Sequence, residues 1–421
     1  MLRLISLKIF ENPSIYSHKP VAKLELEMGS YIDKSSIDIV GLKDRLISDL
    51  PGLANHQCSR GYPGGFLERL AEGTYLPHII EHICLEMQAI FGYDVGYGKT
   101  RWSQEDVYSI VFAYENKQLV KPLVDFVLAY IRSILDKKDF DFRASLVDLK
   151  RHIDKDQASK GQIEPAYIIA ISKDELNSRL ADLLARLLSS RQRMICIKKS
   201  SATYIGKDSI TDKAREKGKV LGKTSGPLRT GKDTDTAILE LDSQGILSEG
   251  LPYTRADMAI ITGLLDEHLG ERHIETIDQV IYIKSLLVEA VKESATVILN
   301  ADDPYYPDFA NKARARILPI SFSRENPIIK GQIKAGKEAV YCFEDGIYLA
   351  EAGKETRLLE FRDMPAKYVA SYLIYDILAA LSAAYVYGIP VAPLKQIFLS
   401  QLRKDQYRGL ETLEPASYYI H

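Results

Sequence analysis

The spacing of hydrophobic positions divides the chain into two parts with different predicted structures. In the first part, alternation over residues 3–10 and 21–28 predicts two β-strands, and the apolar run 107–115 predicts a buried strand. A long helical pattern follows over residues 119–138. Together these elements predict an α+β domain over residues 1–155.

From residue 167 onward, short apolar strands alternate with helical stretches. This alternation is typical of an α/β fold with a doubly wound, mostly parallel sheet. The predicted strands include AYIIAIS, RMICIKK, TAILELD, MAIITGL, TVILNAD and ARILPISF. We therefore expect a linker at 156–166, an α/β domain at 167–408 and a tail at 409–421.

Composition and charge narrow the classes of protein that remain. The 421 residues include 55 basic and 57 acidic side chains, giving a formal charge of −2. This balance gives no reason to expect nucleic-acid binding. No window approaches the ~18 consecutive apolar residues of a membrane span, and the opening MLRLISLKIFENPSIYSHKP lacks the apolar run of a secretory signal. We expect a cytoplasmic protein with no membrane partner.

The cysteines do not suggest a shared site. They are far apart and form no Cys-x-x-Cys pair, so neither a disulfide scaffold nor a thiolate zinc site is predicted. We interpret them as small core residues. They are Cys58, Cys84, Cys196 and Cys342.

One predicted helix carries an unusual set of polar residues. Thr74 is a suitable N-cap, Pro77 falls in the first turn, and Gly92 can end the helix in a left-handed conformation, so 75–91 is predicted to be helical. At about 100° per residue, one stripe of this helix collects three polar residues with Glu81 at its edge. The three are His78, His82 and Glu86. We expect this stripe to face something other than the core.

The polar stripe has the spacing of a metal site. Two histidines at i and i+4 can bind one zinc ion, and a glutamate directly before the second histidine can act as the base on a metal-bound water. The pattern His-x-x-Glu-His is the inverted zincin arrangement. Glu86 is the preferred third ligand, and Glu115 and Glu68 are alternatives. The competing interpretation is a buried polar seam in which the histidines are hydrogen-bonded to glutamates.

Basic residues surround this helix in the sequence. Arg60 and Arg69 belong to a glycine-rich stretch before it, and Lys99 and Arg101 follow a glycine-rich turn after it. Such side chains could bind substrate carboxylates. The alternative is that they are solvated residues beside ordinary turn glycines.

The run CSRGYPGGFLERLAEGTYLPHIIEHICLEMQAIFGYDVGYGKTR, followed by YSIVFAYE, resembles the amino-terminal domain of cyanophycin synthetase over residues 1 to about 155. In that family, this domain precedes an ATP-grasp domain and a Mur-ligase-like module that build poly-aspartate bearing arginine through isopeptide links. The resemblance implies that the domain binds this polymer and, in some members, cleaves it at a metallopeptidase-like site. His78, Glu81 and His82 fall on the motif of that site. Glu68 and Glu72 could then meet the guanidinium groups of the polymer.

The second part resembles the central domain of Mur ligases in TAILELDSQGILSEGL, ADMAIITGLLDEHLG and VILNADDP. Glu240, His268 and Lys284 match metal-binding or carbamoylated positions of the ligase pattern. The family's glycine-rich phosphate loop is replaced by IIAISKDELNSRL at 168–180, which cannot bring successive backbone N–H groups onto phosphates. The ATP-grasp domain and the third Mur domain are also not found. We therefore expect no ATP binding and no ligase activity.

These observations lead to two hypotheses. The first is a zinc-dependent hydrolase of cyanophycin-like β-Asp-Arg polymer, with Glu81 as the base and the Mur-like part as a scaffold or assembly surface of a homo-oligomer. The alternative is a non-catalytic pseudoenzyme, a polymer-binding or regulatory subunit that partners a true cyanophycin synthetase.

Overall fold

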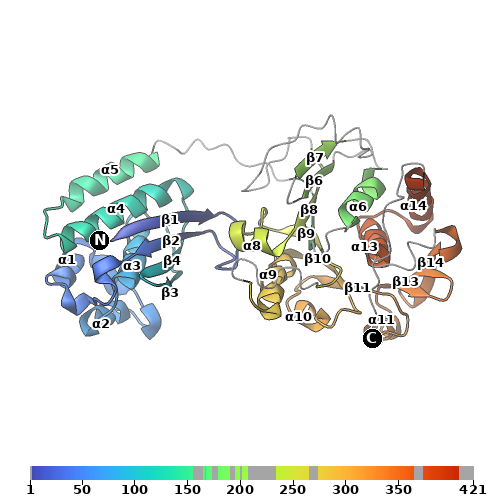
Figure 1. Cartoon of the computed structure of the whole chain (residues 1–421), viewed down its shortest axis with the longest axis horizontal. Helices are drawn as coiled ribbons and strands as arrows, with labels where there is room; N and C mark the ends of the chain where they lie inside the picture. The colour runs from blue at the N-terminus through green and yellow to red at the C-terminus, as the bar shows by residue number, and fades with distance from the viewer. Residues whose placement is uncertain are drawn as a thin grey trace. The chain divides into compact units, whose positions relative to one another are not determined.

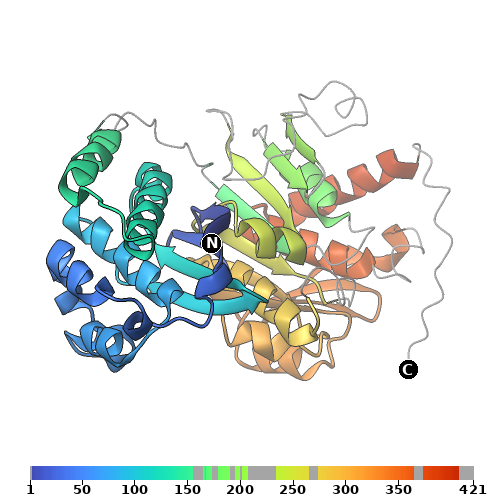
Figure 2. The same ribbon diagram turned by 60° about the vertical axis from the view of Figure 1, so that its left-hand side comes forward.

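The computed structural model of the chain forms two compact units (Figures 1 and 2). It describes residues 2–154, 165, 167–172, 179–189, 195–199, 202–206, 234–264, 274–364 and 373–406. The units are Met1–Gln162 and Ile163–His421, so their division falls within the segment predicted as a linker.

The amino-terminal unit is built on a four-stranded antiparallel sheet of order β1-β2-β4-β3. Its strands are β1 (Arg3–Phe10), β2 (Val21–Glu27), β3 (Gly98–Gln104) and β4 (Val107–Ala113). Its helices are α1 (Leu42–Asp49), α2 (Gly65–Glu72), α3 (Leu76–Ile90), α4 (Lys117–Leu135) and α5 (Phe142–Asp154). Short 3-10 turns connect them: η1 (Gly29–Tyr31), η2 (Ser36–Asp38), η3 (Pro51–Asn55) and η4 (Cys58–Arg60). The α+β prediction for this part is confirmed.

Alternation along the strands gives the sheet two different faces. Leu24, Ile110 and Phe112 pack with α3 and α4 in the main core of the unit. Val21 and Val111 point to the opposite face, where they form a smaller cluster with Phe10 and Ala113. The helix α3 therefore lies on one face of the sheet, and β3 forms an edge beside it.

Helix α3 begins and ends close to the predicted bounds of 75–91. The prediction of Thr74 as its N-cap is wrong, because Tyr75 occupies that position and the hydroxyl of Thr74 contacts a side chain instead. The end is as predicted: Gly92 has φ +88° and donates its N–H to the carbonyl of Ala89 at 2.9 Å.

The second unit is a larger, mostly parallel sheet of order β14-β13-β12-β11-β10-β9-β5-β8-β6-β7 among the described residues. The strands from β12 through to β6 in this order pair in parallel, while β7, β13 and β14 pair antiparallel. The strands are β5 (Tyr167–Ser172), β6 (Ile195–Lys199), β7 (Ala202–Gly206), β8 (Thr236–Leu241), β9 (Ala256–Ile261), β10 (Val291–Asn300), β11 (Arg316–Ser321), β12 (Ala339–Phe343), β13 (Gly346–Glu351) and β14 (Lys354–Glu360).

Helices cover both faces of this sheet, which confirms the predicted doubly wound fold (Figure 1). One face carries α6 (Leu180–Ser189), α13 (Leu373–Val386) and α14 (Val391–Gln406). The other carries α8 (Ser243–Glu249), α9 (Ile277–Glu289), α10 (Tyr306–Ala310) and α11 (Pro327–Lys334), and η5 (Phe361–Asp363) follows β14. Among the helices that the structure describes, none is long and apolar enough to cross a membrane.

Candidate metal centre

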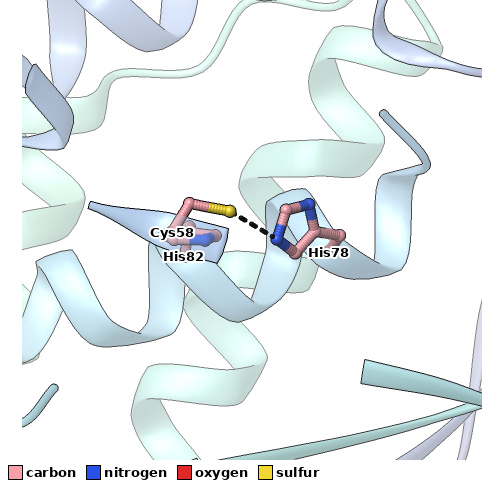
Figure 3. Close-up of side chains that lie close together, drawn as sticks. All are labelled: Cys58, His78 and His82. Atoms are coloured by element: carbon pink, nitrogen blue, oxygen red, sulfur yellow. Dashed lines mark hydrogen bonds between the residues drawn. The ribbon is translucent and has the colours of Figure 1, made fainter. Parts of the chain in front are cut away.

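Three potential metal ligands converge in the amino-terminal unit. Cys58, His78 and His82 each offer one ligand atom, and these atoms all lie within 4.8 Å of one another. The histidines are one turn apart on α3, which places both rings on the same side of the helix. Figure 3 shows the sulfur of Cys58 directed at the ring of His78. The predicted histidine pair is thus joined by a cysteine from η4.

Cys58 occupies an unusual position for a cysteine. Its backbone φ is +53°, in the left-handed region that few non-glycine residues adopt. Its Sγ lies 3.3 Å from Nε2 of His78. Cys58 is half-buried and packs at the edge of the main core rather than inside it, whereas Cys84 and Cys342 are buried as expected. The side chain of Cys196 lies outside the described residues.

An aromatic ring and a hydroxyl fix the histidines. The ring of Phe66 stacks on that of His82 with centroids 4.0 Å apart. The rings of His78 and His82 meet edge to face at 4.8 Å. Thr74 Oγ1 lies 2.8 Å from Nδ1 of His78, so only Nε2 of that ring faces Cys58.

Glu86, the predicted third ligand, is engaged elsewhere. Its Oε2 lies 3.0 Å from Nε2 of His56, and Nδ1 of His56 lies 2.8 Å from Nδ1 of His82. The carboxylate of Glu86 is thus outside the three-ligand group, and His56 is a site residue that the sequence did not suggest. The two alternative ligands are also outside the three-ligand group. Glu115 accepts a hydrogen bond from the backbone N–H of Asp94, and Glu68 accepts one from the hydroxyl of Tyr62.

Glu81, the predicted base, points toward β3. Its Oε2 accepts a hydrogen bond of 2.5 Å from Thr100 Oγ1. A Cβ atom at Gly98 would lie 2.5 Å from Oε1 of Glu81, so the glycine makes room for this carboxylate. Burial raises the pKa of Glu81 to about 7, although the hydrogen bond from Thr100 opposes this shift.

The polar stripe is buried, contrary to the expectation that it faces away from the core. Glu81, His82 and Glu86 are each at most 6% exposed. Burial lowers the pKa of His78 to about 4, and the positive charge of Arg69 adds to this effect. Burial likewise lowers the pKa of His82, with smaller contributions from His78 and His56. Both candidate ligands are therefore neutral at pH 7 and keep a lone pair for a metal.

The four basic residues predicted to bind substrate lie at different positions relative to the candidate metal centre. Arg69 is close enough to affect His78, and its Nε is buried without a hydrogen-bond partner. Arg60 is paired with Glu72. Lys99 and Arg101 flank Thr100 on β3, so strand alternation directs them to the sheet face opposite α3. Of these four basic residues, Arg69 is the one that the structure brings to the candidate metal centre.

The ligase-like positions of the second unit are partly described. Glu240 is buried near the end of β8, and Lys284 is buried on α9. Burial lowers the pKa of Lys284 to about 7, while Asp303 opposes the shift. His268 and residues 173–178 of the segment 168–180 lie outside the described residues.

The motif NADDP at the end of β10 makes structural hydrogen bonds. Asp303 accepts the backbone N–H groups of Leu264 at 2.8 Å and Tyr305 at 2.7 Å. Asp302 accepts from Ser321 Oγ at 2.7 Å and from the backbone of Phe322 at 2.6 Å. These contacts give the two aspartates a role in holding loops together.

Comparison with known proteins finds one matching domain-family model within each unit. Residues 23–136 match the cyanophycin synthase-like N-terminal domain, and residues 181–384 match the Mur ligase middle domain. A cyanophycin synthetase of Geminocystis herdmanii is 29% identical over 233 residues, which cover 54% of this chain and 26% of that protein. One of Crocosphaera subtropica is 34% identical over 151 residues, which cover 35% of this chain and 17% of that protein.

Solved structures also match, at lower similarity. A UDP-N-acetylmuramoyl-L-alanyl-D-glutamate--2,6-diaminopimelate ligase has a TM-score of 0.40 at 16% identity, covering 61% of this chain and 49% of that one. The chain spans about a quarter or less of the length of the curated cyanophycin synthetases named above. Over the matched residues, the chain is similar to a cyanophycin synthase-like N-terminal domain followed by a Mur ligase middle domain, and it resembles cyanophycin synthetases.

Proposed function

We propose that the amino-terminal unit is a zinc-dependent hydrolase that cleaves isopeptide bonds in cyanophycin-like polymers of β-linked aspartate and arginine. The observation that carries this proposal is the convergence of ligand atoms from Cys58, His78 and His82 within 4.8 Å. The polymer class is taken from the relatives, which are named cyanophycin synthetases.

The residues present fit zinc. Imidazole nitrogen and thiolate sulfur are its usual protein ligands, and three protein ligands leave the fourth position open, as in catalytic sites. Cys58 takes the place of Glu86, which was predicted as the third ligand. The hydrogen bond between Thr74 Oγ1 and Nδ1 of His78 and the stacked ring of Phe66 orient the histidines, as neighbours of metal ligands usually do.

Zinc at this position would supply a water of lowered pKa and would polarise the amide carbonyl. Glu81, next to His82 on α3, is held by Thr100 through Oε2, which leaves Oε1 to accept the proton of the attacking water. The water oxygen bonds to the carbonyl carbon, the C–N bond breaks, and Glu81 returns its proton to the leaving amine. Arg69, with its buried Nε, binds a carboxylate of the polymer.

The test compares zinc content and polymer breakdown for the native chain, Glu81→Gln and the control Glu105→Gln, which changes an exposed glutamate. We expect about one zinc per chain in all three proteins and breakdown by the native and control proteins alone. Absence of zinc from the native chain, or breakdown by Glu81→Gln at the native rate, would refute the proposal. Polymer binding without zinc and without breakdown would support the non-catalytic subunit instead.

For the second unit we propose a scaffold role without ATP-dependent ligation. The support is the sequence at 168–180, which has no glycine with which to form a phosphate loop. Calorimetry with ATP and magnesium at millimolar concentration tests this. Measurable binding would contradict it.

A further inference from the structure

Two short contacts connect a buried carboxylate to a candidate metal ligand through a second histidine. Oε2 of Glu86 lies 3.0 Å from Nε2 of His56, and Nδ1 of His56 lies 2.8 Å from Nδ1 of His82. Both ring nitrogens of His56 are thereby occupied. His56 is therefore a bridge between the two residues of α3.

The acceptor character of a carboxylate sets the direction of the hydrogen bonds. An ionised glutamate only accepts, so His56 must carry its proton on Nε2 and donate it to Glu86. When His56 is neutral, its ring has one N–H group and one lone pair, so with the proton on Nε2 its Nδ1 accepts. His82 must then donate from Nδ1, which leaves its lone pair on Nε2.

We propose that Glu86 and His56 form a relay that holds His82 as the Nδ1–H tautomer and so presents Nε2 to the metal. The metal part of this inference rests on the proposed function, whereas the tautomer does not. Glu86 and His56 are positioning residues that act through His82. A carboxylate–histidine pair behind a ligand commonly fixes its tautomer and orientation in this way.

The surroundings hold the relay in place. A Cβ atom at Gly52 would lie 1.9 Å from Oε1 of Glu86, so the backbone of η3 closes directly over the carboxylate. Phe66 covers the ring of His82 on one side at 4.0 Å. Since Glu86 and His82 are buried, each polar atom that lost its partner here would carry a desolvation cost.

The first test uses the metal-free full chain labelled with ¹⁵N-histidine, because ring nitrogen shifts distinguish the two tautomers. The signal of His82 is assigned by its loss in His82→Gln. We expect the Nδ1–H tautomer in the native chain and in the control His18→Phe, an exposed site. We expect the Nε2–H tautomer in His56→Phe. Finding Nε2–H in the native chain, or no change in His56→Phe, would overturn the relay.

The second test measures zinc affinity by competition with a chelator. We expect His56→Phe and Gly52→Ala to bind zinc about 10–100-fold more weakly than the native chain, as for other residues behind metal ligands. The controls His18→Phe and Gly96→Ala should match the native affinity, since a Cβ at Gly96 meets no atom within 4 Å. Unchanged affinity in both test variants would refute the role toward the metal. A native chain that binds no zinc would refute the proposed function, and the tautomer result would still decide the relay.

Discussion

Sγ of Cys58 lies 3.3 Å from Nε2 of His78, although 20 residues separate them in the sequence. Cys58 makes this contact from η4 with a left-handed backbone. A left-handed non-glycine residue costs on the order of 1 kcal/mol or more and persists where its surroundings enforce it. Such residues are concentrated at functional sites, which agrees with a ligand role for this thiol.

Removal of the Cys58 thiol should abolish tight zinc binding. Cys58→Ala leaves two histidine ligands, and we expect its zinc affinity to fall by more than the ~100-fold associated with residues behind the ligands. Elemental analysis after dialysis measures the effect. Cys84→Ala is the matched control, because Cys84 is buried within α3 and outside the ligand group. Equal zinc content in the two variants would show that Cys58 is not a ligand.

The space that Gly98 leaves for the carboxylate of Glu81 should be required for turnover. In Gly98→Ala, the new methyl group would meet Oε1 of Glu81 at 2.5 Å and its Cγ at 2.7 Å, so the carboxylate must move. We expect polymer breakdown to fall at least ~10-fold while zinc content is retained, since a displaced base loses much of a contribution of about 10²–10⁴. Gly96→Ala, two residues away in open space, should keep native turnover. If Gly98→Ala breaks down the polymer at the same rate as Gly96→Ala, the present position of the Glu81 carboxylate is not required for turnover.

Arg69 and Arg101 should differ in their effect on substrate binding. Arg69 has a buried Nε without a partner beside His78, whereas Arg101 lies on the sheet face opposite α3. A hydrogen bond to a charged group is worth about 1.5–3 kcal/mol, so Arg69→Gln should lower kcat/KM by roughly 10–100-fold. Arg101→Gln should leave kcat/KM unchanged in steady-state kinetics. If Arg101→Gln lowered kcat/KM more than Arg69→Gln did, the substrate would bind on the face of β3 that carries Arg101.

The periodic part of the site could be predicted from sequence, and the loop part could not. Helical spacing placed His78 and His82 on one side of α3, because both belong to one regular element. Cys58 and His56 lie where no repeating pattern links sequence to position, so only the tertiary fold brings them to the helix. Glu86 was on the predicted face, but its carboxylate contacts His56 and lies outside the group formed by Cys58, His78 and His82.

The same distinction applies to the sheets. Alternating and buried runs predicted the strands of both units, but strand order depends on connections that a sequence does not display. Lys99 and Arg101 illustrate a smaller case. Alternation required both to point away from Thr100, but which face of β3 met α3 became known only from the pairing of β3 with β4.

An ion pair in the second unit gives a stability prediction with a definite dependence on pH. Arg324 binds Glu355 through two hydrogen bonds of 2.9 and 2.7 Å, and the hydroxyl of Tyr341 also donates to this carboxylate. The bond from Arg324 is the main cause that lowers the pKa of Glu355 from 4.5 to about 2. A carboxylate with a lowered pKa stabilises the fold above its unfolded value, and this contribution is lost as the pH falls from 4.5 toward 2. Both side chains are about 30% exposed, so solvent screening limits the effect of Glu355→Gln on the free energy of unfolding to about 1 kcal/mol at pH 7.

Urea unfolding followed by circular dichroism should show this difference at pH 7 and a smaller one at pH 3. Glu344→Gln, at an exposed position in the turn between β12 and β13, should show none at either pH. A difference of the same size at pH 7 and pH 3 would mean that Glu355 contributes through packing rather than through its charge.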